Sequence, residues 1–310
     1  MSRDLGAGII LLVLQVTAFY PVWRWYAARV TDGSDEPWGL VALATALFFV
    51  MWRKGGNLPK SGCALPSPYP SPKGRGNFVI IPGGSLSLRE RVGVRVSHGT
   101  SPSLLFPALL TLFYAASYFF APRLIQAATA VAAVGCMVSA LRWGKVAHAP
   151  TLCLLLLSLP VVPSLQFYLG YPFRVVAGAL AAPLLQMAGF AVVREGACLF
   201  WGSEVIFIDA PCSGVRMLWT GLFCAFAVAS FLDLSNSRTM IAACFAVCAI
   251  ILGNALRAAA LFYVEAGIVS MPWWGHEAVG ITVFLAVSSI VIWLVHAVKG
   301  RNPCEAQACL

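Results

Sequence analysis

Long uncharged apolar runs, separated by short polar connections, dominate the chain. Most approach the roughly 20 apolar residues that a helix needs to cross a bilayer. A helix also satisfies its own backbone polar groups inside lipid, so such runs predict membrane-spanning helices. The candidate runs are Leu5–Trp23, Pro37–Trp52, Leu104–Ala121, Leu124–Leu141, Ala149–Tyr171, Val175–Val193, Met217–Leu232, Thr239–Leu256 and Ala278–Val298.

Composition narrows the fold class to an all-α polytopic membrane protein. Hydrophobic residues make up 60% of the 310 residues and charged residues only 11%, against about 45–50% and about 25% in soluble domains. This hydrophobicity also excludes disorder for most of the chain. We read residues 1–310 as a single domain in the bilayer. In such a protein the net charge of +9 reports orientation rather than a nucleic-acid partner.

The run Val175–Val193 differs from the others because it contains Gly178, Pro183, Gln186 and Gly189. These residues suit a surface-lying or re-entrant helix better than one that spans the membrane. If this run does not cross, the chain makes about eight spans with both termini inside, and 14 of the 21 Lys and Arg residues are cytoplasmic. Half of those 14 lie in one long loop, where the positive-inside rule weakens. The rule therefore favours eight spans by a moderate margin.

Two segments do not follow the pattern of spans. The stretch Gly55–Pro102 is rich in Pro, Gly, Ser and Arg and lacks a helical period. A connection of this length without its own structure is either functional or disordered, and we predict a disordered insertion. Residues 173–211 are predicted to form an extracytoplasmic segment. Within it, the β-prone runs Cys198–Trp201 and Glu204–Ile208 flank a Gly-Ser turn, which indicates a small hairpin that leads to Cys212.

Polar residues at the edge of the membrane are energetically expensive and are therefore functional candidates. In the eight-span topology they gather on the outer face, at the ends of three consecutive spans. The candidates are Asp209, Cys212, Ser213, Gly214 and Arg216 before the sixth span, Asn254 and Arg257 at the end of the seventh, Glu265 between spans, and His276 and Glu277 at the start of the eighth. His148 and His296 have no comparable company in the sequence.

Each candidate has a structural and a chemical interpretation. Most cysteines here are packing residues, but Cys212 precedes Ser-Gly at a predicted helix start, where backbone N–H groups stabilise a thiolate or an oxyanion. Arg257 either snorkels to the interface or serves as a fixed cation on the same helical face as Asn254. His276 is either an interfacial histidine or an acid/base partner. The outer-face residues contain no Cys-x-x-Cys or His-x-x-x-His pair, so no metal site is predicted.

Together, APCSGVR at Ala210–Arg216, NALR at Asn254–Arg257 and the single His276 resemble the signature of the exosortase/archaeosortase family. YPVWRW at Tyr20–Trp25 and the polar segment that leads into Cys212 are similar to the same family. The resemblance implies a polytopic cysteine transpeptidase with Cys212 as nucleophile, Arg257 as essential cation and His276 as acid/base. Asp209, Ser213, Gly214, Arg216 and Asn254 would support these three, and no cofactor or metal would be needed.

The resemblance also implies the substrates and the setting. They are secreted proteins whose C-terminal sorting signal combines a short motif such as Pro-Glu-Pro (the PEP-CTERM type), a transmembrane helix and a basic cluster. The family is tied to bacteria that make exopolysaccharide, which implies an inner-membrane protein with an extracytoplasmic active site. Two alternatives remain: a transporter or scaffold of exopolysaccharide export, and an inactive protein that binds sorting signals. The transporter predicts charges at the midplane of several spans, whereas here they lie at span ends.

Overall fold

The computed structural model describes residues 2–31, 38–52, 102–209 and 213–299. The prediction for Gly55–Pro102 therefore lies outside the described residues, except for Pro102 at the start of a helix. The helices are α1 (Ser2–Ala18), α2 (Tyr20–Thr31), α3 (Trp38–Trp52), α4 (Pro102–Ser117), α5 (Arg123–Trp143), α6 (Ala149–Leu157), α7 (Val162–Met187), α8 (Val215–Leu232), α9 (Asn236–Glu265) and α10 (Gly275–Lys299), and the strands are β1 (Val192–Glu195), β2 (Cys198–Trp201) and β3 (Glu204–Phe207).

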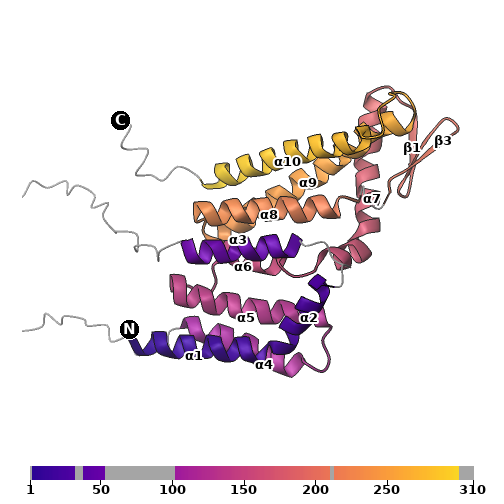
Figure 1. Ribbon diagram of the computed structural model, residues 1–310. Helices are drawn as coiled ribbons and strands as arrows, with labels where there is room; N and C mark the ends of the chain where they lie inside the picture. The colour runs from indigo at the N-terminus through magenta and orange to yellow at the C-terminus, as the bar shows by residue number, and fades with distance from the viewer. Residues whose placement is uncertain (1, 32–37, 53–101, 210–212, 300–310) are drawn as a thin grey trace, which may run out of the picture.

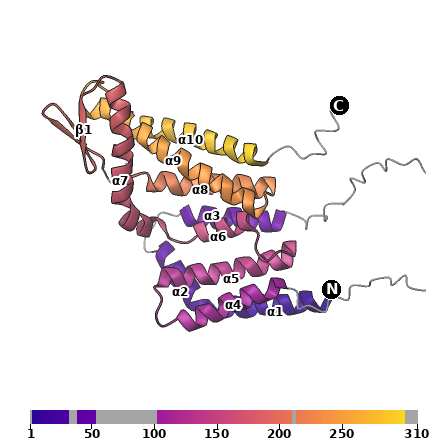
Figure 2. The same cartoon turned by 180° about the vertical axis from the view of Figure 1, so that it is seen from behind.

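Most helices run side by side along one direction and form a bundle (Figure 1). Helix α7 runs across one end of this bundle, and the small sheet lies next to α7 at that end (Figure 1). The view from behind shows the same order, with α8, α9 and α10 on one side of the bundle and α1, α4 and α5 on the other (Figure 2). The predicted class, a helical polytopic membrane protein, is confirmed.

The number of spans is lower than the predicted eight. Among the described residues, five helices are long and apolar enough to cross a membrane, or six if α1 and α2 count as one span bent by 56°. Pro21 follows the bend, where its missing N–H and its fixed φ suit the first turn of a new helix. The runs Pro37–Trp52 and Leu104–Ala121 form α3 and α4, of 15 and 16 residues, which are short for a span.

The predicted span Ala149–Tyr171 is wrong, because the helix breaks within it. Helix α6 ends at Leu157 after nine residues, and α7 begins at Val162. Pro160 lies in this break, where proline cannot continue the hydrogen bonds of α6. Helix α7 then runs for 26 residues without interruption. It runs crosswise to the bundle (Figure 1), but it is also one of the five helices among the described residues that are long and apolar enough to cross a membrane. That Val175–Val193 follows the surface therefore stays a prediction, and the helix ends at Met187 and not at Val193.

The predicted hairpin is present, and it has one more strand than predicted. Strands β2 and β3 pair antiparallel across the Gly-Ser turn, as predicted, and β1 adds a third strand in the order β1-β2-β3. Strand β1 was not predicted, because its residues Val192 and Val193 read as the end of the apolar run Val175–Val193 in the sequence. The sheet packs on the C-terminal part of α9 through a cluster that includes Leu199, Ile206, Ile208 and Phe262.

Helices α8, α9 and α10 pack closely because small residues lie at their contacts. A Cβ at Gly221 of α8 would lie 2.5 Å from the side chain of Ile250 on α9, and a Cβ at Gly253 of α9 would overlap Val287 on α10. Ala225, Ala229, Ala242 and Ala246 are buried in the same cluster. This close packing fixes the rotation of α9 against both neighbours, and so the positions of the polar residues near its end.

Candidate active site

The start of α8 is built around Gly214. Its φ of +81° lies in the left-handed region that favours glycine. A Cβ on Gly214 would lie 2.7 Å from the Asn254 side chain of α9, closer than real contacts allow. Glycine is therefore required here both by the backbone and by the neighbour, and the two motifs that contain Gly214 and Asn254 touch directly.

Ser213 ties the segment after Cys212 to the crosswise helix. Its side chain is buried, and its hydroxyl donates a hydrogen bond to Oε1 of Gln166 on α7 at 2.9 Å. The same hydroxyl accepts from the backbone N–H of Val215 at 3.4 Å, at the start of α8. No local motif distinguishes Gln166 in the sequence, because only the direction of α7 brings this residue to Ser213.

Asn254 and Arg257 share one face of α9, as predicted, but they do not lie at its end. The helix continues for two turns beyond Arg257, to Glu265. From Asn236 to Arg257 the helix rises about 31 Å, close to the roughly 30 Å of a bilayer's hydrocarbon core. Residues 258–265 then extend about 12 Å further and pack against the sheet.

The guanidinium of Arg257 packs against α10 at Gly280. A Cβ on Gly280 would lie 3.3–3.5 Å from the guanidinium Nη2, Nε and Cζ atoms, so the absence of a side chain at Gly280 leaves room for this cation. The Nε atom is buried and has no hydrogen-bond partner among the described residues. A buried donor without a partner costs roughly 1–3 kcal/mol, which makes this atom a candidate for binding a ligand.

His276 lies in the first turn of α10, one helical turn before Gly280. Its Nδ1 atom lies 3.4 Å from Oε1 of Glu265, the last residue of α9. The side chains are 41% and 52% exposed, so a substrate could reach the imidazole. A carboxylate at Nδ1 favours the tautomer with its proton on that atom and orients the ring, which leaves Nε2 for proton transfer.

A pocket of about 230 Å³ lies between β3 and the ends of α9 and α10. Asp209, Glu265 and His276 line its polar part, and Ala258, Leu261 and Phe262 of α9 line its apolar part. The sequence candidates Asp209 and His276 are thus brought to one cavity. Arg216, by contrast, is exposed on the first turn of α8 and does not line this pocket.

Cys212 lies outside the described residues, so the position of the candidate site is inferred from the residues on either side of it. Asp209, three residues before it, lines the pocket, and Ser213, directly after it, is anchored on α7. The chain therefore joins the pocket to the Gly214–Asn254 contact through Cys212. Within the ranges that the structure describes, no group of three His, Cys, Asp or Glu residues could hold a metal ion.

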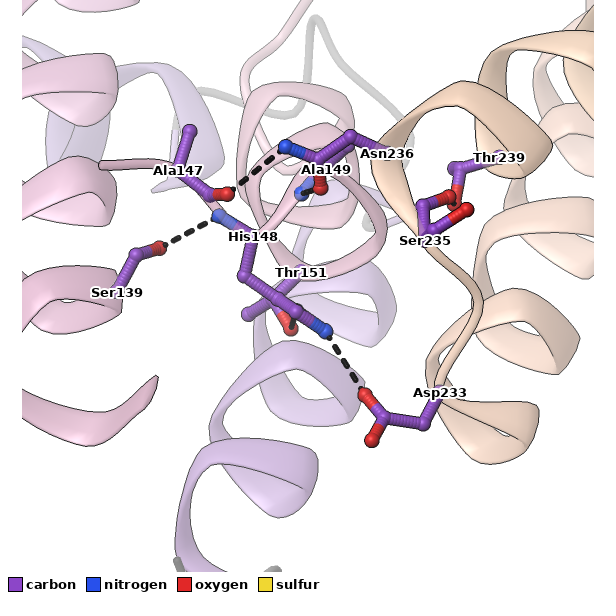
Figure 3. Close-up of polar contacts among 9 residues, drawn as sticks. All are labelled: Ser139, Ala147, His148, Ala149, Thr151, Asp233, Ser235, Asn236 and Thr239. Carbon is purple, nitrogen blue, oxygen red and sulfur yellow. Dashed lines mark hydrogen bonds and ion pairs between the residues drawn. The ribbon is translucent and has the colours of Figure 1, made fainter. Parts of the chain in front are cut away.

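A polar network forms around His148 at the end of the bundle far from the candidate site. The sequence pattern did not predict the network, whose contacts are drawn in Figure 3. His148 is buried, with Nδ1 2.9 Å from Oγ1 of Thr151 and Nε2 3.2 Å from Oδ1 of Asp233. Its ring stacks on Trp143 at 4.4 Å. The Asn236 amide bonds the backbone on both sides of His148, at Ala147 O and Ala149 N.

These contacts join the loop between α5 and α6 to the turn between α8 and α9, so His148 does have partners. It is a spatial pairing across 85 positions of the sequence, and no local motif announces it. Asn236 of the network and Arg257 are about 31 Å apart along α9, which separates the network from the candidate active site.

Comparison with known families gives one match. No curated protein and no solved structure shows a significant match to the chain. The family of transmembrane exosortases matches residues 74–293, which is more than half of the 310 residues and includes Cys212, Asn254, Arg257 and His276. The match begins inside the stretch Gly55–Pro102. The chain therefore belongs to the transmembrane exosortase family.

Proposed function

We propose that this integral membrane protein is a cysteine transpeptidase or endopeptidase that cleaves the C-terminal sorting signals of secreted proteins. Family membership supports an exosortase-type function. One observation carries the residue assignment. The motif that contains Cys212 touches Asn254, while Arg257 on the same face of α9 touches α10 one turn from His276. Three motifs that are distant in sequence are interlocked at one end of the bundle.

In the proposed reaction, the Cys212 thiolate attacks the scissile carbonyl and forms a tetrahedral oxyanion. Arg257 and backbone N–H groups near Gly214 hold that oxyanion, in keeping with the unpartnered buried Nε of Arg257. His276 protonates the departing amine as the intermediate collapses to a thioester on Cys212. An amine nucleophile or water then attacks the thioester, passes a proton to His276 and releases the thiolate.

The supporting residues act by position. Ser213 and Gly214 hold the chain next to the nucleophile, Asn254 packs against Gly214, and Asp209 lines the pocket. Arg216 is proposed to help from the exposed side of α8, with less support from the geometry.

The test is co-expression with a reporter protein that ends in a sorting signal of the motif–helix–basic type. Wild type should shorten the reporter, and Cys212→Ala should not, whereas Cys244→Ala, an exposed cysteine of α9, should behave as wild type. His276→Gln should slow processing by about 10²–10⁴-fold, and the same change at His296, exposed near the other end of α10, should not. Processing by Cys212→Ala at the wild-type rate would refute the nucleophile assignment.

The proposed location is the inner membrane, with the site on its extracytoplasmic face. A thiol reagent that cannot cross the membrane, added to intact spheroplasts, should label a variant whose only cysteine is Cys212. Labelling only after the membrane is made permeable would reverse the proposed orientation.

A further inference from the structure

The two outer edges of the three-stranded sheet have different surroundings. The β1 edge packs on α7, and the carbonyl of Val192 on that edge accepts a hydrogen bond from the Gln186 side chain at 2.8 Å. Covering an edge in this way prevents it from pairing with another chain. The β3 edge instead borders the pocket, whose lining includes every residue from Glu204 to Asp209. A lining of consecutive residues indicates that the pocket faces the edge of the strand and not one of its faces.

The register shows which backbone groups point into that pocket. Strands β2 and β3 pair antiparallel with Leu199 opposite Ile206 and Cys198 opposite Phe207, and the N–H of Ile208 donates to the carbonyl of Ala197 at 3.0 Å. In an antiparallel pair, alternate residues direct their N–H and C=O groups at the partner strand. Glu204, Ile206 and Ile208 therefore face β2.

Val205 and Phe207 direct their backbone groups away from β2. No described residue outside the sheet bonds these groups. They form a short ladder of free donors and acceptors, which is the surface that a strand-adding peptide recognises.

We propose that the free edge of β3 binds an extended segment of the substrate polypeptide as an additional strand. This inference rests on the proposed function and names where the substrate lies before cleavage. Strand β3 is followed by Ile208 and Asp209 and then, three positions later, by Cys212. A peptide paired with Val205 and Phe207 therefore runs along the segment that leads to the nucleophile, with His276 and Glu265 on the opposite wall of the pocket.

The chemistry of the edge favours a polypeptide over other occupants. Small-molecule pockets usually measure about 300–1,000 Å³, and this one is smaller, at about 230 Å³. One side of the pocket is the backbone of β3, whose alternating N–H and C=O groups can all be hydrogen-bonded only by another extended backbone. A second copy of the sheet would have to enter the space between β3 and the helices α9 and α10, which already pack on the sheet.

The sharpest variant removes one outward donor and leaves the ladder between β2 and β3 intact. Phe207→Pro does this, because proline lacks the N–H and is tolerated on an edge strand when that N–H faces outward. Processing of the sorting-signal reporter should fall about ten-fold. Phe207→Ala removes the side chain but keeps the N–H, and it should fall clearly less. Arg194→Pro makes the same backbone change on the outward side of β1 and should retain the wild-type rate.

Photo-cross-linking provides a measurement that does not depend on turnover. Benzoylphenylalanine is placed at Phe207 in the full-length Cys212→Ala protein, and at Val193 of β1 as the matched control. Both native side chains are 66% exposed. The co-expressed reporter should cross-link at position 207 and not at position 193.

The outcomes separate this inference from the proposed function. No reporter cross-link at position 207, or a cross-link between two copies of this chain there, overturns strand addition whether or not wild type cleaves the reporter. Full activity of Phe207→Pro also overturns it. A cross-link at position 207 together with a reporter that wild type leaves uncut supports strand addition and refutes the proposed cleavage.

Discussion

Replacing Gly214 with alanine perturbs the contact that joins the Cys212 motif to α9. The change adds one methyl group at a position with a φ of +81°. It also places that methyl 2.7 Å from Cγ and Nδ2 of Asn254, whose side chain is 5% exposed and cannot move freely. Two separate penalties therefore act at one residue.

The structure allows the two penalties to be sized. A left-handed backbone costs an L-residue about 1–2 kcal/mol, and an extra methyl in a packed contact typically costs about 1–3 kcal/mol. Their sum predicts a loss of about 2–5 kcal/mol for Gly214→Ala. Gly189→Ala is the matched control, because Gly189 has a φ of +94° but nothing within 4 Å of its added Cβ. It should lose only the backbone part.

The assay is thermal unfolding of the purified, detergent-solubilised proteins, together with reporter processing in cells. Gly214→Ala should unfold at a lower temperature than Gly189→Ala, and it alone should process the reporter more slowly. Adding Asn254→Ala to Gly214→Ala should recover part of the lost stability, since it removes the atoms that the methyl meets. Equal destabilisation by the two glycine substitutions would refute the contact between Gly214 and Asn254.

Three further predictions concern other parts of the molecule. His148→Ala should lower stability by about 2–3 kcal/mol, because it leaves a cavity and breaks the link to Asp233, while the catalytic rate of the folded protein stays unchanged; a selective loss of rate would place His148 in the reaction. Gly280→Leu should displace the Arg257 guanidinium and slow processing by at least about ten-fold with normal membrane insertion, and wild-type kinetics would contradict the packing of Arg257 on α10. Deleting Gly55–Pro102 should leave processing intact, and its loss would show that this stretch has a role.

Local spacing predicted which residues share a helical face better than hydropathy predicted where the helices end. The spacing of Asn254 and Arg257 was sufficient to place them on one face, because three residues are close to one helical turn. The predicted end of α9, Leu256, lies nine residues before the observed end, Glu265. The hydropathy of the apolar run falls at Arg257, but the helix is stabilised beyond that point by packing of Leu261 and Phe262 against the sheet, and hydropathy does not register such contacts.

The outcome for α6 and α7 has a similar cause. Apolar residues continue from Ala149 to Tyr171, so the run reads as one span. Pro160 breaks it locally, but the crosswise direction of α7 (Figure 1) depends on its packing against α8 and α9. That direction in turn brings Gln166 to Ser213.

Composition alone was sufficient to identify a helical membrane protein, because lipid accepts only segments that satisfy their own backbone hydrogen bonds, and such segments are recognisable by their apolar composition. The sequence also identified which few polar residues could carry chemistry, because polar groups are scarce and expensive near lipid. Which of them meet became visible only in the folded protein. The examples are the contact of Gly214 with Asn254, the packing of Arg257 against Gly280, the free edge of β3 and the partners of His148. Each of these joins residues on different elements, and the physical reason is that close packing between elements, unlike hydropathy or helical period, leaves no regular trace along the chain.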